Sequence, residues 1–116
     1  MWLSINSSAP GKPGNFPVEV WKKRIAEQNV KSTAVLLDQT GEVGHKFDAK
    51  TTPHMFIINP KGILVYQGGI DSIRSTDKAD IQKAVPYVRN VLEAGLGGKP
   101  IPEPSRTTSY GCGVKY

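Results

Sequence analysis

The strongest constraint on the fold lies at residues 54–69, where two apolar runs meet at a tight turn. The runs read HMFIINP and GILVYQGG, and the turn is centred on Asn59-Pro60-Lys61-Gly62. A connection this short cannot join parallel strands, because a parallel crossover needs a dozen or more residues. The two runs are therefore predicted to form an antiparallel β-hairpin.

Shorter apolar segments upstream predict two further strands and one short helix. Residues 2–6 (WLSIN) alternate in polarity and residues 33–38 (TAVLLD) form an apolar run, so both are expected to be strands and the second to be buried. Val43 and Phe47 stand four residues apart, after the turn-forming segment QTGEV. This spacing predicts one or two helical turns that end near Ala49.

A longer helix is predicted between these two strands. Val18, Trp21 and Ile25 recur at helical spacing, so they are expected to share one face of this helix. Asn15 is expected to cap the N-terminus of this helix, and Asn29 is expected to mark its end.

A second long helix is predicted to begin at Asp77 and to end at Gly95 or Gly97. Its expected buried stripe consists of Ile81, Val85, Val88 and Leu92. Pro86 falls inside that stripe, and a proline in a helix interior removes one backbone hydrogen bond and crowds the preceding turn. We therefore expect a kink or a break near residue 85.

The order of these elements predicts the fold class. Strands that alternate with helices and finish in a hairpin and a helix indicate an α/β protein, with a mixed sheet flanked by helices. The length of 116 residues favours one domain, which we assign to residues 1–96. Residues 97–116 contain three prolines and show no periodicity, so they form a C-terminal tail that is either loose or held in a groove of the domain.

Composition argues against several classes of partner. No apolar run approaches the roughly 20 residues that a membrane-spanning helix needs. The net charge is +5, but the basic residues are scattered and no nucleic-acid-binding motif accompanies them. His45 and His54 lack the ligand spacing of a zinc site, and the single cysteine, Cys112, excludes a disulfide or a Cys-x-x-Cys centre within this chain. The sequence thus predicts no membrane, nucleic-acid, metal or cofactor partner.

Residues 33–71, TAVLLDQTGEVGHKFDAKTTPHMFIINPKGILVYQGGID, resemble the C-terminal half of a thioredoxin-like redoxin of the alkyl hydroperoxide reductase/thiol-specific antioxidant type. The likeness lies in a strand that ends in Leu-Asp, the Gly-Glu-Val segment, the Thr-Pro dipeptide and the Pro-Lys-Gly turn. WLSINSSAPGK near the start and YGCGVKY at the end are also similar to a subgroup of these redoxins. The resemblance therefore covers nearly the whole chain.

The resemblance implies a site around Pro53. In such folds the matching proline is in the cis form beside the reactive cysteine, so Pro53 is expected to be cis and Thr52, Pro53 and His54 to contact substrate. Family members carry the reactive cysteine on a strand-to-helix turn upstream of the strand that matches residues 2–6. The resemblance thus implies an incomplete thioredoxin-like fold that lacks the N-terminal cysteine-bearing segment. Such a chain is expected to be marginally stable or to self-associate through an exposed sheet edge.

Two candidate residues keep alternative interpretations. Cys112 is either an auxiliary or resolving thiol that folds back toward the redox centre, or a lone thiol on a mobile tail. His54 either assists proton transfer near a thiolate or is a strand-end residue with one satisfied hydrogen bond. Asp38 and Glu42 are interpreted as structural, because they stand at a strand end and at a helix start.

The resemblance implies an intact parent that is a thiol–disulfide or peroxide oxidoreductase. Its partners would be a disulfide or peroxide substrate, or a thiol reductant protein. This chain, without the primary nucleophile, is expected to have little or no activity of its own. The alternatives are a non-enzymatic thioredoxin-like module that binds a peptide or protein, and a structural fragment. The compartment stays open, because the cytoplasm fits the chain as given but an export signal would have been lost with the N-terminal segment.

Overall fold

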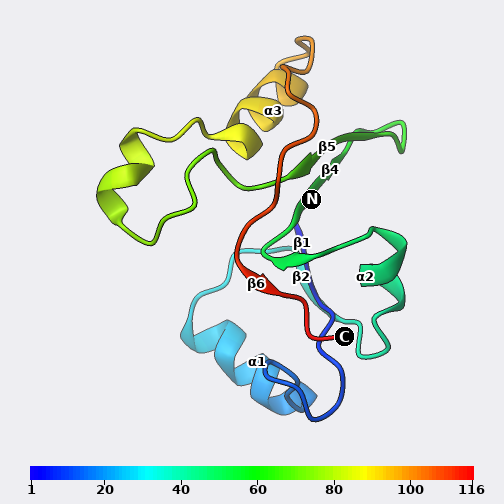
Figure 1. The fold of residues 1–116 in the computed structure, drawn as a ribbon. Helices are drawn as coiled ribbons and strands as arrows, with labels where there is room; N and C mark the ends of the chain where they lie inside the picture. The colour runs from blue at the N-terminus through cyan, green and yellow to red at the C-terminus, as the bar shows by residue number, and fades with distance from the viewer. The chain divides into compact units, whose positions relative to one another are not determined.

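A computed structural model describes residues 1–116 as mixed α/β structure with short strands and helices (Figure 1). In chain order, the elements are β1 (Leu3–Asn6), α1 (Val18–Glu27), β2 (Ala34–Leu37), α2 (Glu42–Lys46), β3 (Thr51–Thr52), β4 (Met55–Ile58), β5 (Leu64–Gly68), the 3-10 helix η1 (Lys78–Gln82), α3 (Tyr87–Leu96) and β6 (Cys112–Gly113). The strands form three separate pairs, β1–β2, β3–β6 and β4–β5, in place of one continuous sheet.

The chain divides into two compact units. The first consists of Met1–Ala49 with Val114–Tyr116, and the second consists of Lys50–Gly113. The tail is therefore shared between the units, and each unit is described by itself. The assignment of one domain to residues 1–96 stays a prediction.

In the first unit, β1 and β2 pair in parallel, with Leu3 opposite Ala34 and Ile5 opposite Leu36. Residues of a strand alternate between its two faces, so Leu3, Ile5 and Leu36 lie on one face. These three side chains are 43%, 45% and 44% exposed. The prediction that residues 33–38 form a buried strand is therefore wrong for this face, because no helix or strand of the first unit covers it.

Helix α1 follows a loop that is closed by Asn15. The Asn15 side-chain amide donates to the carbonyl oxygen of Ser8 (2.9 Å), and the residue at the N-cap of α1 is Pro17. The prediction that Asn15 caps the helix is thus wrong, because its side chain is already engaged with the preceding loop. Asn29 has φ +50, in the left-handed region, and the helix ends just before it, as predicted.

Asp38 is buried at the start of α2 and organises that turn. Its carboxylate accepts hydrogen bonds from the Ser7 hydroxyl (2.7 Å) and from the backbone N–H groups of Gly44 (2.9 Å) and Val43 (3.2 Å). Burial raises the pKa of this carboxyl, but these hydrogen bonds, together with a contribution from the Glu42 backbone N–H, outweigh burial and hold the pKa below its ordinary value. The structural interpretation of Asp38 is confirmed.

Tyr116 closes the first unit over the same helix. Its ring stacks on His45 (3.9 Å between centroids), and its hydroxyl donates to the Ala49 carbonyl oxygen (2.7 Å). A side chain at Gly44 would collide with the Tyr116 ring, so the close approach requires glycine there. The end of the tail is therefore held in place.

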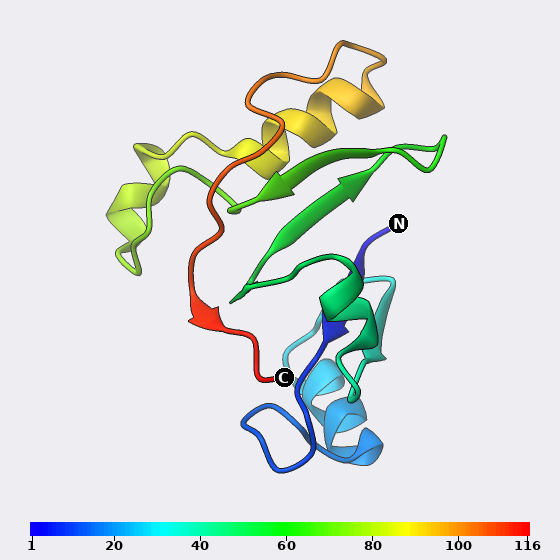
Figure 2. The ribbon, with the colours of Figure 1, turned by 45° about the vertical axis from the view of Figure 1, so that its right-hand side comes forward.

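In the second unit, β4 and β5 form the predicted antiparallel hairpin, with Phe56 opposite Gln67 and Ile57 opposite Tyr66 (Figure 2). The Asn59 side-chain oxygen accepts from the backbone N–H groups of Lys61 and Ile63, both at 3.0 Å. These bonds fix the turn locally, which explains why the turn could be recognised from the sequence.

The buried core of the second unit is small and lies where α3 packs on the hairpin. It consists of Tyr66, Val88 and Val91. Asp77 caps η1 by accepting from the Ala79 backbone N–H (2.9 Å), and the helical path then breaks before α3, as predicted for Pro86. Because of this break Ile81 (68% exposed) and Val85 (48% exposed) do not share the α3 stripe, and their predicted burial is wrong.

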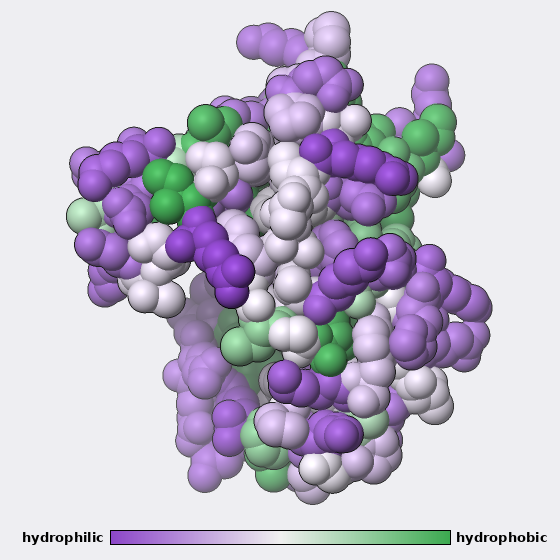
Figure 3. Space-filling view, in the orientation of Figure 1, coloured by the Kyte–Doolittle hydropathy of each residue, from purple (hydrophilic) through white to green (hydrophobic).

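The tail runs beside β5 instead of hanging loose. The Gln67 backbone N–H donates to the Ser105 carbonyl oxygen (3.1 Å), and the Thr107 backbone N–H donates to the Gln67 carbonyl oxygen (3.0 Å). Of the two predicted alternatives for the tail, the structure has the held one. Many large apolar side chains nevertheless stay at the surface among polar ones (Figure 3). None of the helices combines the length and the apolar character required to cross a bilayer.

Candidate functional site

The loop from Thr52 to His54 joins β3 to β4 in the second unit. The Thr52–Pro53 peptide bond is cis, which confirms that expectation. The Thr51 hydroxyl donates to the Pro53 carbonyl oxygen (2.9 Å), so the loop is closed by its own side chain. Thr52 and Pro53 are both exposed.

Strand β6 brings the only cysteine to this loop. Cys112 lies directly opposite Thr52 in an antiparallel pair, and Gly113 lies opposite Thr51. Directly opposed residues have Cα atoms about 4.5–5.5 Å apart and side chains on the same face of the ladder. The Cys112 thiol is free and exposed, so it sits at the surface beside the Thr52 side chain.

Gly111 makes the closest approach between the tail and the loop. Its φ of +129 lies in the region that favours glycine, and an added Cβ would collide with the Thr52 carbonyl oxygen and lie 2.9 Å from the Thr52 carbonyl carbon. The same Cβ would be 3.5 Å from the Pro53 nitrogen. The backbone of Gly111 therefore packs directly against the Thr52–Pro53 peptide.

His54 turns back toward β3. Its Nδ1 accepts from the Lys50 backbone N–H (3.2 Å), and its ring packs on Phe56 with centroids 4.4 Å apart. An imidazole nitrogen that accepts carries no proton, so this contact places the proton of the neutral ring on Nε2. The geometry agrees with the interpretation of His54 as a strand-end residue whose hydrogen bond is satisfied.

Thr107 anchors the tail just upstream of the site. The Tyr66 hydroxyl donates to the Gly69 carbonyl oxygen (2.6 Å) and lies 2.7 Å from the Thr107 hydroxyl, which also accepts from the Gly69 N–H (3.0 Å). Because the Tyr66 proton is used on Gly69, the Thr107 hydroxyl donates to Tyr66. Burial raises the pKa of Tyr66, and the Thr107 hydrogen bond opposes that shift.

Tyr110 makes a second anchor between Thr107 and β6. Its hydroxyl donates to the Asp71 carboxylate (2.6 Å), and the same oxygen accepts from the Ile73 N–H (3.0 Å). Burial, followed by the hydrogen bond to Asp71, raises the pKa of Tyr110 to about 12. A hollow of about 360 Å³ lies here, lined by Asp71, Ser72, Arg74, Tyr87 and residues 107–110.

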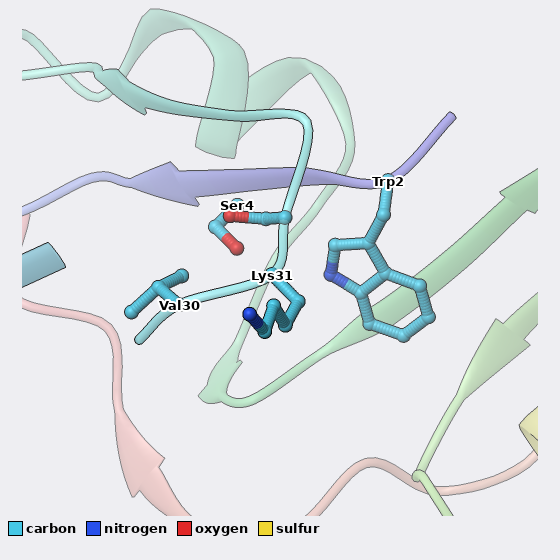
Figure 4. A pocket seen from close by; sticks show the side chains of 5 residues that line it. Trp2, Ser4, Val30 and Lys31 are labelled. Carbon is cyan, nitrogen blue, oxygen red and sulfur yellow. The ribbon is translucent and has the colours of Figure 1, made fainter. Parts of the chain in front are cut away.

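A separate hollow of about 410 Å³ lies in the first unit. It is lined by Trp2, Ser4, Val30, Lys31 and Ser32 (Figure 4). The Lys31 ammonium donates to the Asn29 side-chain oxygen (2.6 Å), and the lining contains no thiol, imidazole or carboxylate. The Ser4 and Ser32 hydroxyls in this lining therefore have no imidazole or carboxylate beside them to act as a general base. No cluster of three or more His, Cys, Asp or Glu side chains suited to holding a metal ion occurs in either unit.

Sequence reasoning missed the residues that hold the tail in place. Gly111, Thr107 and Tyr110 were not singled out, and neither was Asp71. The two glycines around Cys112 were the available signal, because paired glycines in an aperiodic segment favour a close backbone approach. Thr107 and Tyr110 gave no such signal, since their partners lie far away in the sequence.

Comparisons with known proteins support the fold and name no function. No protein-family model and no curated protein matches the chain. A crystal structure described as an uncharacterized conserved protein from Geobacillus kaustophilus is 28% identical to this chain, with a TM-score of 0.76. The match covers 98% of this chain and 58% of the Geobacillus chain. A hypothetical protein from Sinorhizobium meliloti 1021 is 24% identical with a TM-score of 0.81, and the match covers 98% of this chain and 60% of its own. This chain thus spans somewhat less than two thirds of the solved structures it matches.

Proposed function

We propose that this chain is a thioredoxin-like redoxin module in which Cys112 and the Thr52–Pro53 loop form one thiol site. The single observation that carries the proposal is the pairing of Cys112 opposite Thr52, with Gly111 packed against the Thr52–Pro53 peptide. A lone thiol on a mobile tail would have no fixed position relative to this loop. In the redoxins that the chain resembles, the loop that matches Thr52–Pro53 lies beside the reactive cysteine.

We assign Cys112 the role of an auxiliary or resolving thiol. In the redoxins that the chain resembles, the primary nucleophile is a cysteine on a strand-to-helix turn, whereas Cys112 lies in the tail strand β6. The thiolate attacks one sulfur of a disulfide, a new bond forms between Cys112 Sγ and that sulfur, and the old sulfur–sulfur bond breaks. The departing thiolate takes up the proton that Cys112 released. Atoms and electrons balance without a further reactant.

The substrate side of the proposal is a disulfide or a peroxide-oxidised thiol. A resolving thiol condenses with a sulfenic acid, forming a disulfide and releasing water. The reacting partner is a second thiol protein or a further part of the same redoxin, and a thiol reductant restores Cys112. The chain on its own is expected to exchange once and not to turn over insulin disulfides or peroxide.

Pro53→Ala is expected to change the rate of exchange between Cys112 and a small aromatic disulfide by at least about threefold. The reason is that the Thr52–Pro53 peptide packs against Gly111, the neighbour of Cys112, and groups coupled through a shared backbone contact interact by roughly 0.5–3 kcal/mol. The measurement is the release of the coloured thiol, followed at several pH values. Leu96→Ala, at an 88% exposed position of the same unit, is the matched control and should leave the rate unchanged. Equal rates for Pro53→Ala and wild type, with both chains folded by circular dichroism, would show that Cys112 and the loop are not one site.

A further inference from the structure

We propose that β6 closes the edge of β3 beside Cys112, and that Gly111 thereby keeps extended polypeptides from pairing at this edge while small thiol-reactive molecules still reach the Cys112 thiol. This inference rests on the proposed function, since it names the substrate class of the same site. It starts from the pairing partners of β3. Strand β3 pairs with β6 and with no other strand.

An unpaired strand edge is a ready template for another strand. Exposed N–H and C=O groups recruit extended peptides by strand addition, and the main-chain hydrogen bonds supply the affinity. On the side of β3 that faces the tail, these groups are opposed by Cys112 and Gly113 of the same chain. A polypeptide substrate would have to displace β6 before it could pair there.

Gly111 is the residue that allows the tail to come so close. Its φ of +129 and the collision of any Cβ with the Thr52 carbonyl oxygen mean that a residue with a side chain cannot take its place unchanged. Gly113 is different, because an added Cβ there would have only the Lys50 carbonyl oxygen nearby, at 4.0 Å. The closed edge therefore depends on glycine at position 111 and not at position 113.

The tail is also fixed on its upstream side, so β6 does not depend on its own short ladder alone. Thr107 is hydrogen-bonded to Gln67 (3.0 Å) and lies 2.7 Å from the Tyr66 hydroxyl, and Tyr110 donates to Asp71 (2.6 Å). A competing strand must overcome these contacts as well. The Cys112 side chain itself stays exposed, so a small disulfide can reach the thiol without entering the ladder.

The test uses a fluorescent synthetic peptide of residues 105–113 that carries the Cys112→Ser change, titrated against the full chain. Gly111→Ala is expected to bind this peptide at least about tenfold more tightly than wild type, because the edge is opened. Gly113→Ala, the matched control in the same strand, is expected to behave like wild type. Wild type should still form a mixed disulfide with glutathione disulfide at Cys112, seen by mass spectrometry.

Three results would overturn the inference. They are peptide binding to wild type as tight as to Gly111→Ala, no gain in binding for Gly111→Ala, and no reaction of wild-type Cys112 with glutathione disulfide. If Gly111→Ala does not fold, the variant that opens the edge is Cys112→Pro, because proline cannot donate a hydrogen bond to a strand ladder. Its matched control is then Cys112→Ser. The rate test with Pro53→Ala addresses the proposed function separately, so either proposal can fail while the other stands.

Discussion

Tyr66→Ala is expected to lower the free energy of unfolding of the second unit by about 3–5 kcal/mol, the usual cost of removing a buried aromatic side chain. Tyr66 is only 1% exposed and is the largest member of a core that otherwise consists of Val88 and Val91. The side chains that pack against this core are only partly buried, so the cavity left by Tyr66 would lie close to solvent. The measurement is urea unfolding followed by near-ultraviolet circular dichroism of the tyrosines.

The hydroxyl of Tyr66 can be tested apart from its ring. Tyr66→Phe removes the hydrogen bond to the Gly69 carbonyl oxygen and the contact with the Thr107 hydroxyl, which keeps only the Gly69 N–H as a partner. Leaving a buried carbonyl without its donor costs about 1–3 kcal/mol. Tyr87→Phe is the matched control, since Tyr87 packs on the same core at a partly exposed position. Tyr66→Ala within about 1 kcal/mol of wild type would contradict this description of the core.

Asp38→Asn is expected to cost about 1–3 kcal/mol at pH 7, because a neutral amide cannot replace a carboxylate that accepts from Ser7, Val43 and Gly44. Both tryptophans, Trp2 and Trp21, belong to the first unit, so tryptophan fluorescence during urea unfolding reports on this unit. The variant should unfold at lower urea concentration than wild type.

The effect of Asp38 depends on pH in a defined direction. The folded state holds the Asp38 pKa below the value of about 3.9 expected in the unfolded chain. The stabilisation by the carboxylate is therefore present above about pH 4 and is lost as the pH falls through the folded pKa. The difference in the free energy of unfolding between wild type and Asp38→Asn should disappear below pH 4. Glu42→Gln, in an exposed pair with Lys46 (2.7 Å), is the control and should change stability by less than about 1 kcal/mol at any pH. A gap that stays constant down to pH 2 would contradict this role of the charge.

The parts of the fold that could be predicted are those determined by local chemistry. The hairpin follows from Asn59 and Gly62 in the turn, and the helix break follows from Pro86, because each residue acts on its own neighbours in the chain. The cis bond before Pro53 followed from the resemblance and not from the Thr-Pro dipeptide alone.

The errors fall where tertiary contacts outweigh local patterns. Asn15 has the chemistry of a helix cap, yet its side chain bonds to Ser8. Leu36 belongs to an apolar run, yet its side chain is 44% exposed, because no element of the first unit packs on this face of the β1–β2 pair. In the sequence, Ile81 continues the apolar spacing of α3, but the break before Pro86 separates Ile81 from that helix.

The candidate site was only half visible in the sequence. Thr52, Pro53 and Cys112 were singled out, but Cys112 kept two interpretations because nothing in the tail shows periodicity. The strand that holds Cys112 is two residues long, and its partner β3 is equally short. A two-residue pair such as β3–β6 depends on residues that hold the tail in place, such as Thr107 and Tyr110. Their partners lie in distant parts of the sequence.

The most direct test of the site is a cross-link between β3 and β6. Thr52→Cys places a second thiol directly opposite Cys112, within the Cα separation of about 4.4–6.8 Å that disulfides accept. Mild oxidation of the dilute protein should then consume both thiols within one chain. Thr51→Cys points to the other face of the strand and should keep its thiols free. Rapid intrachain closure of Thr52→Cys but not of Thr51→Cys is the predicted result, whereas equal behaviour of the two variants would contradict the pairing on which the site is built.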